Sequence, residues 1–187
     1  MIDLDITSMP LVFIDVETTG FSATKNRMIE VAATRVEGGK VTQVVSTLLS
    51  MPDEVHPKIT EITGIKQEDL VGKPEFIEIA PQLMRILDGA IFVAHNAKFD
   101  YAFFKEEFRR INEEFSAVTL CTVELSKLFF PSQANHKLQT LIELHQFTFT
   151  DRHRAEDDAN ILRQFLALIE RDFGIENLRA NCQRVLI

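Results

Sequence analysis

The spacing of hydrophobic residues divides the first third of the chain into short strand-like runs. Residues 11–16 (LVFIDV) form an apolar, β-rich run with an acidic tip, which is typical of a buried strand. Two further β-rich runs, 27–36 and 40–49, are separated only by residues 37–39 (EGG). Because such a short glycine-containing connection favours a hairpin, the three runs predict an antiparallel meander.

Helical spacing dominates after Pro52 and is interrupted by two short apolar runs. Strands are expected at 90–94 and 117–121. Helices are expected at 57–63, 75–87 (with a kink or break at Pro81), 97–114, 122–129, 137–145 and 155–171. This order predicts an α/β fold, in which helices flank a mixed five-stranded sheet of three antiparallel strands followed by parallel ones.

The length of 187 residues fits one domain, 1–187, with a motif-bearing core of about 11–170 and a C-terminal extension, 171–187, that carries no readable motif. The chain is 45% hydrophobic, and no apolar run approaches the roughly 20 residues that span a membrane. No secretory signal is visible, so we expect a soluble cytoplasmic protein without a membrane partner. Cys121 and Cys182 would then be reduced thiols.

The formal net charge of −8 argues against a protein that coats long nucleic-acid tracts, because such binding depends on a broad cationic surface. It is compatible with an enzyme that grips only a chain end. Such an enzyme can neutralise phosphate with bound divalent cations.

Asp15 and Glu17 stand two residues apart at the end of the first predicted strand. Side chains alternate along a strand, so both carboxylates should lie on the same face. The pair is a candidate metal clamp, and the alternative is two solvated acids at a strand end.

Two further acids are expected to point inward from helices. Asp100 shares a helical stripe with Phe104, Phe108 and Ile111, although its place near a helix start also suits a capping role. Asp158 aligns with Leu162, Phe165, Leu166 and Ile169, whereas Asp157 aligns with Asn160 and Gln164. Asp158 should therefore face the core and Asp157 the solvent.

Several inward carboxylates would repel one another unless hard cations such as Mg²⁺ or Mn²⁺ bind between them. Two such ions can clamp a phosphodiester, activate a water and stabilise the leaving oxygen. His153, placed on the loop before the last predicted helix, could accept the proton of that water; the alternative is a surface histidine between two arginines. His95 could contact substrate or pin a strand end.

Three ordered motifs resemble the DnaQ-like proofreading exonucleases of the DEDDh branch. They are FIDVETTGF at 13–21, AHNAKFDYAFF at 94–104 and RHRAEDDA at 152–159. The segments ITEITGI at 59–65 and LCTVELSKLFFP at 120–131 also look like family segments. Together they extend the resemblance over about 11–168, nearly the whole chain.

The resemblance implies a ribonuclease H-like fold and a metal-dependent 3′→5′ exonuclease that releases nucleoside 5′-monophosphates from DNA in proofreading or repair. It implies that two divalent cations are bound by Asp15, Glu17, Asp100 and Asp158, with His153 as the general base. The implied pocket for the terminal nucleotide contains Thr18, Thr19, Gly20, Phe21, Ile62 and Thr63, and its opposite wall contains Asn96, Phe99 and the candidate His95. Phe21 could stack on a base, and its alternative is a core position.

The expected partners are single-stranded DNA or the 3′ end of a duplex, and a DNA polymerase or repair nuclease. The LCT and RHRAEDDA segments look closer to exonuclease modules found alone or fused to excision-type nucleases than to the polymerase subunit that typifies the family. An exoribonuclease similar to ribonuclease T or oligoribonuclease keeps the same chemistry and remains open. The complete set of acids and histidine argues against a non-catalytic binding module, and the absence of G-x-G-x-x-G argues against a dinucleotide site.

Overall fold

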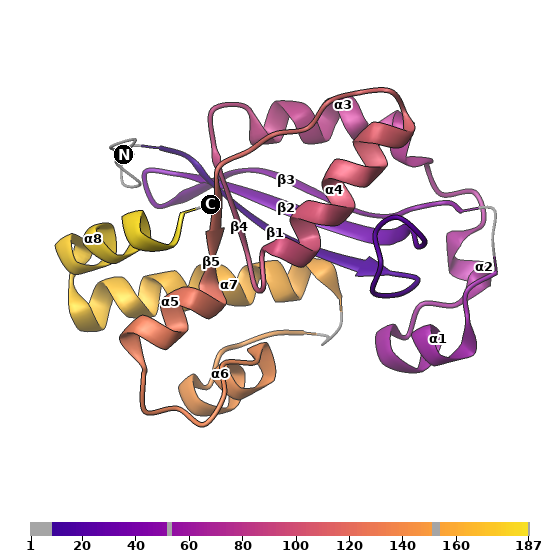
Figure 1. Ribbon diagram of the computed structural model, residues 1–187. Coiled ribbons are helices and arrows are strands. Elements are labelled where there is room, and N and C mark those ends of the chain that lie inside the picture. The colour runs from indigo at the N-terminus through magenta and orange to yellow at the C-terminus, as the bar shows by residue number, and fades with distance from the viewer. Residues whose placement is uncertain (1–8, 52–53, 151–153, 187) are drawn as a thin grey trace.

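The computed structural model describes residues 9–51, 54–150 and 154–186. Their central element is a five-stranded sheet with the order β3-β2-β1-β4-β5 (Figure 1). Its strands are β1 (Leu11–Thr18), β2 (Met28–Glu37), β3 (Lys40–Leu48), β4 (Ile91–Ala94) and β5 (Thr119–Cys121). The first three pair antiparallel, and β1, β4 and β5 pair parallel, so the predicted mixed sheet is confirmed.

Helices cover both faces of this sheet (Figure 1). They are α1 (Pro57–Thr63), α2 (Gln67–Leu70), α3 (Phe76–Leu87), α4 (Lys98–Arg110), α5 (Thr122–Phe129), α6 (Leu138–His145), α7 (Ala155–Phe173) and α8 (Ile175–Val185). The cores divide accordingly, because α3 and α4 pack on one face while α5 to α8 pack on the other.

The alternation along β1 assigns its side chains to these two cores. Val12, Ile14 and Val16 enter the core shared with α3 and α4. Phe13 enters the core shared with α7. By the same alternation, Asp15 and Glu17 lie on the face covered by α7.

Of the kink or break expected at Pro81, the break was wrong, because α3 continues through this residue. Proline removes one backbone donor from a helix. Pro81 is itself exposed, whereas Ile79, Leu83 and Ile86 on the packed side are buried. Since most helix stability in proteins comes from such packing, the apolar face outweighs the lost hydrogen bond.

One helix end also differs from the prediction, and one helix was not predicted. Helix α4 stops at Arg110 rather than 114, and Asn112 adopts a left-handed φ of 60° just beyond it. Beyond the predicted end of α7, the C-terminal segment forms α8, which buries Leu178 and Cys182 against α7. Within the described residues, no helix combines the length and apolar character that a bilayer crossing requires.

Candidate active site

Three carboxylates meet where the end of β1 approaches the start of α7. Asp15 and Glu17 come from β1 and Asp158 from α7, and each offers a ligand atom within 4.8 Å of the other two. In Figure 1 these two chain segments lie together at the right-hand end of the sheet. Three oxygen donors this close favour a hard divalent cation, because its charge offsets their mutual repulsion.

Asp100, the fourth predicted ligand, is not among these three clustered acids and lies in the first turn of α4, which packs on the face of the sheet opposite α7. Its side chain is buried, and burial raises its pKa from 3.8 to about 8; hydrogen bonds from the N–H groups of Asp100 and Val16 partly offset this rise. Val16 stands between Asp15 and Glu17 in the chain. The contact therefore brings Asp100 to the strand that carries the other acids.

The Val16 N–H can face Asp100 because β4 is short. The pairing of β1 with β4 ends at Phe13 and Val93, three residues before Val16. Beyond that point the edge of β1 is open on the β4 side, and the first turn of α4 occupies it. The helical stripe predicted that Asp100 points inward, and the sheet supplies the partner that an inward acid requires.

The helical stripe predicted for α7 is confirmed. Asp158 is buried, as are its stripe partners Leu162, Phe165, Leu166 and Ile169. Asp157 is partly exposed, in line with the expectation that it faces solvent, and its carboxylate accepts a hydrogen bond from the Thr150 N–H at 3.1 Å. That bond ties the segment before α7 to its first turn.

Glu30 on β2, which was not among the predicted site residues, is buried opposite Glu17 in the β1–β2 register. Its carboxylate accepts hydrogen bonds from the Arg154 guanidinium and the Ala155 N–H. The sequence contained a signal for Glu30, because it is an acidic residue within an apolar predicted strand that follows the strand with Asp15 and Glu17. His153, which directly precedes Arg154, lies outside the described residues.

The turn after β1 is held by its own polar groups. Thr18 is buried, and its hydroxyl donates to the Gly20 carbonyl at 2.8 Å. A Cβ added to Gly20 would lie 2.8 Å from the Asn26 side chain, so any other residue here would force that side chain to shift. The next residue, Phe21, is 88% exposed, which excludes a core position for it.

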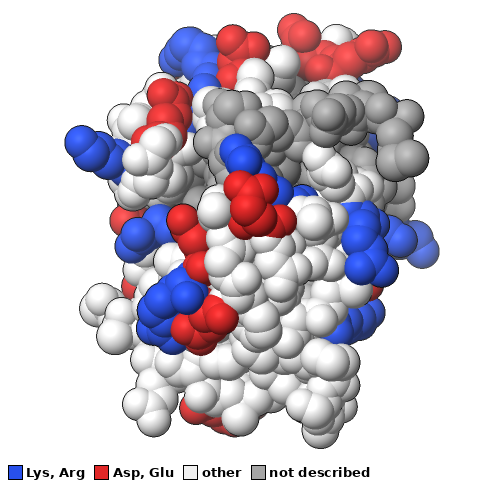
Figure 2. Space-filling model, turned by 90° about the vertical axis from the view of Figure 1, so that its left-hand side faces the viewer, with Lys and Arg blue, Asp and Glu red and all other residues white. Residues whose placement is uncertain are grey.

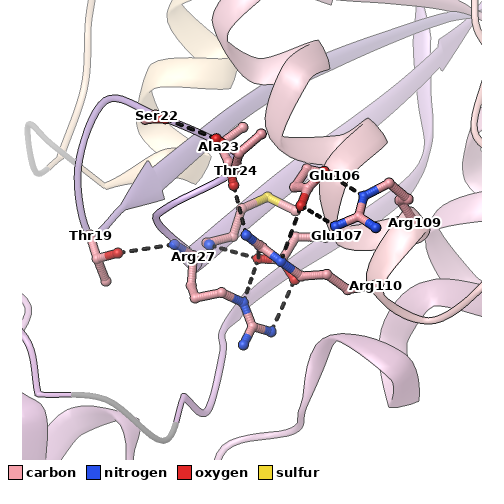
Figure 3. A network of polar contacts seen from close by, with 10 residues as sticks. Thr19, Ser22, Ala23, Thr24, Arg27, Glu106, Glu107, Arg109 and Arg110 are labelled. Carbon is pink, nitrogen blue, oxygen red and sulfur yellow. Dashed lines mark hydrogen bonds and ion pairs between the residues drawn. The ribbon is translucent and has the colours of Figure 1, made fainter.

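A buried carboxylate on α4 braces this loop (Figure 3). Glu107 is 1% exposed and accepts from Arg27 Nε at 2.9 Å and Nη2 at 3.0 Å. Arg110 donates to Glu107 at 2.8 Å and to the Ala23 carbonyl at 2.7 Å. The Arg27 N–H in turn donates to the Thr19 hydroxyl at 3.0 Å, so both ends of the loop are fixed relative to α4.

Of the two predicted pocket residues on α1, only one presents a side chain to the surface. Ile62 is 43% exposed. Thr63 is buried, and its hydroxyl donates to the Ile59 carbonyl and accepts from the Ile65 N–H. Thr63 thus stabilises the end of α1.

The connection from β4 to α4 carries the remaining pocket candidates. His95 Nδ1 lies 2.9 Å from the Thr122 hydroxyl, so the strand end is pinned to α5. Asn96 is exposed and adopts a left-handed φ of 64°, a conformation that asparagine tolerates better than most residues. The half-buried Phe99 packs on Phe103 with ring centroids 5.0 Å apart.

Charge is distributed without a large patch of one sign on the side of the molecule that carries α8. Among the described residues on that face, acidic and basic side chains are interspersed (Figure 2). The described residues of this face thus form no broad cationic surface for phosphate.

Comparisons with known proteins match most of the chain. The family model described as Exonuclease (RNase_T) covers residues 12–166. The 3′-5′ exonuclease DinG of Bacillus subtilis is 36% identical over 163 residues, which are 86% of this chain and 18% of that protein. The DNA polymerase III subunit epsilon of Aquifex aeolicus is 32% identical over 161 residues, 85% of this chain and 80% of that protein.

A solved structure of exonuclease X in complex with 5′ overhanging duplex DNA has the same fold. Its TM-score is 0.71 at 24% identity, and the match covers 92% of this chain and 99% of that one. By contrast, the chain spans only 11–19% of the PolC-type polymerases and DinG exonucleases that it matches. The sequence match and the epsilon relative together establish that the chain belongs to the RNase T/DnaQ-like exonuclease family.

Proposed function

We propose that the chain is a metal-dependent 3′→5′ exonuclease that hydrolyses phosphodiester bonds at the 3′ end of DNA and releases nucleoside 5′-monophosphates. The observation that carries this proposal is the cluster of Asp15, Glu17 and Asp158. Membership of the exonuclease family supports it.

The donor set fits hard cations, since every proposed ligand is a carboxylate. Asp15, Glu17, Asp100 and Asp158 would hold two divalent ions, Mg²⁺ or Mn²⁺. When bound, such ions activate a water for attack on phosphorus and stabilise the leaving 3′ oxygen. A bound cation would stabilise the ionised Asp100 carboxyl and so oppose the rise in its pKa that burial causes.

The residues of the chain divide the remaining work. His153 is proposed as the general base that accepts the proton of the attacking water, a role that suits the ordinary pKa range of histidine. The proposed binding pocket for the terminal nucleotide contains Thr18, Thr19, Gly20, Phe21, Ile62, Thr63, His95, Asn96 and Phe99. The exposed Phe21 and Ile62 would contact the base, whereas the buried Thr18 and Thr63 would hold their positions.

DNA is the favoured substrate because the matched relatives include subunits of DNA polymerase III and a solved exonuclease bound to duplex DNA. The proposed DNA ligand is a single strand or the 3′ end of a duplex. Because several relatives carry a matching segment within a much longer protein, we also propose a DNA polymerase or repair nuclease as the partner.

The test uses single-stranded DNA and RNA of the same sequence, labelled at the 5′ end or the 3′ end. Each is incubated with the wild type or Asp15→Asn in Mg²⁺, Mn²⁺ or chelator. Stepwise shortening of the 5′-labelled DNA and early release of a labelled mononucleotide from the 3′-labelled DNA are expected, both dependent on metal and Asp15.

Two outcomes would change the assignment. Faster shortening of RNA than of DNA would favour the exoribonuclease alternative. Intact substrates under all metal conditions would contradict the proposed activity.

For His153→Ala we expect strongly reduced turnover with metal affinity largely kept. Loss of metal binding in this variant would contradict the role of His153 as the base.

A further inference from the structure

A buried carboxylate outside the acidic cluster joins the sheet to the start of α7. Glu30 on β2 is 1% exposed and lies directly opposite Glu17 in the β1–β2 register. Its Oε1 accepts from Arg154 Nη2 at 2.7 Å and from Nε at 3.0 Å, and its Oε2 accepts from the Ala155 N–H at 3.2 Å. Both oxygens are therefore engaged by the helix start, which leaves Glu30 poorly suited to bind a metal itself.

This contact replaces an ordinary helix cap. The first N–H groups of a helix lack partners within the helix, and a side chain of the N-cap residue often supplies one. The N-cap residue of α7, Arg154, makes no such bond. Glu30 supplies the acceptor from a neighbouring strand, and its negative charge also suits the positive end of the helix dipole.

A backbone hydrogen bond in the first turn of the helix links this contact to Asp158. The Asp158 N–H donates to the Arg154 carbonyl at 3.1 Å. Arg154 is thus bound to Glu30 by its side chain and to Asp158 by its backbone. One turn along the helix, the Asp158 carboxylate meets Asp15 and Glu17.

We propose that Glu30 is a positioning residue, which fixes the first turn of α7 against the sheet so that Asp158 can share a divalent cation with Asp15 and Glu17. Glu30 and Glu17 are neighbours across two paired strands. The contact from Glu30 to α7 therefore restrains the position of this helix relative to β1. The inference deepens the metal-dependent function proposed above and rests on it.

The test measures Mn²⁺ binding by calorimetry without DNA, in the wild type, Glu30→Gln and Glu30→Asp. Loss of a residue that orients a metal ligand typically costs 10–100-fold in metal affinity or activity, so we expect Glu30→Gln to weaken Mn²⁺ binding by about 10-fold or more. Glu30→Asp keeps the negative charge and should recover part of the Mn²⁺ affinity that Glu30→Gln loses. In cleavage assays kcat should fall at fixed Mg²⁺, while KM for a DNA oligonucleotide changes little.

Glu106→Gln is the control, because Glu106 pairs with Arg109 and Arg110 within α4, which packs on the opposite face of the sheet from α7. Its Mn²⁺ affinity should equal that of the wild type. If Glu30→Gln does not fold, Arg154→Gln tests the same link at a side chain that is 45% exposed.

The outcomes separate this proposal from the proposed activity. If Glu30→Gln unfolds at a lower temperature but binds Mn²⁺ as tightly as the wild type, Glu30 is only structural and the proposal is overturned. If the wild type binds Mn²⁺ but shortens no DNA, the proposed exonuclease function fails, while weakened binding in Glu30→Gln still supports the positioning role.

Discussion

At the scale of single residues, the buried carboxyl of Asp100 couples the site to pH. Burial raises its pKa from 3.8 to about 8 in the folded chain, while in the unfolded chain the carboxyl keeps its ordinary range. At pH values between these two pKa values, the folded state holds a proton on Asp100 that the unfolded state has released. The free energy of unfolding contributed by this group is therefore fully present below about pH 4 and is lost as the pH rises towards 8.

Asp100→Asn should remove this loss when no metal is bound. In chelator, the variant should be more stable than the wild type at pH 8 by at least about 1 kcal/mol, or about 2–4 °C in unfolding temperature, with a smaller difference at pH 5. Thermal unfolding at several pH values measures it, with the exposed Asp88→Asn as control. Parallel curves for the wild type and Asp100→Asn would contradict the buried, protonated state.

Phe21 is 88% exposed, so its ring is available to stack on a nucleobase. Phe21→Ala should raise KM for single-stranded DNA by about 5-fold or more, because stacking on a base contributes about 1–3 kcal/mol. The unfolding temperature should stay unchanged, since the ring buries little surface in the free protein. Steady-state kinetics with oligonucleotides checks this, and an unchanged KM would exclude a stacking role.

At the scale of elements, the loop after β1 depends on α4 for its position. Arg27, Glu107 and Arg110 join the loop to the helix through charged hydrogen bonds around a buried carboxylate (Figure 3). Such bonds are stronger and more directional than neutral ones. Helix α4 thus fixes both Asp100 at its first turn and the loop that presents Phe21.

Arg110→Ala should loosen that loop without disturbing the acids. We expect a several-fold higher KM for DNA at an unchanged Mg²⁺ dependence. The neighbouring Arg109→Ala is a matched control, because the Arg109 side chain is 70% exposed and pairs with Glu106 on its own helix. Equal effects of the two substitutions on KM would show that general charge, rather than the brace, is responsible.

At the scale of the whole molecule, the sheet separates two cores, and the site lies at one end of it. Helix α8 lies at the other end, beyond the last turn of α7 (Figure 1). It completes the core on the α7 face with the buried Leu178 and Cys182. Changes in α8 should therefore alter the free energy of unfolding without altering the rate of hydrolysis at the site.

Leu178→Ala should cost about 2–5 kcal/mol of unfolding free energy, because it leaves a cavity in a packed core. Activity per folded molecule should be unchanged. Denaturant unfolding and a rate assay on the same samples test this, with Leu144→Ala as control, since Leu144 is 56% exposed and should shift stability by less than about 0.5 kcal/mol. A fall in kcat at full folding would mean that α8 acts on the site.

Periodicity in the sequence was enough to predict a mixed sheet and the main helices. It also predicted the faces of their elements on which the four acids lie, namely Asp15, Glu17, Asp100 and Asp158. It did not decide whether Pro81 breaks its helix or which group pairs with Asp157. The loss of one backbone bond at Pro81 is local, whereas the packing that outweighs it comes from distant residues. Asp157 has the spacing of an exposed residue, and only the folded chain brings Thr150 to it.

The sequence by itself determined which side chains point inward, because strand and helix periods are properties of the local backbone. Only the tertiary structure decided which inward groups meet. It brought Asp158 to Asp15 and Glu17, the Val16 N–H to Asp100, and Arg154 and Ala155 to Glu30. These contacts join residues up to 143 positions apart, from Asp15 to Asp158 (158 − 15), and their geometry depends on how helices pack on the sheet.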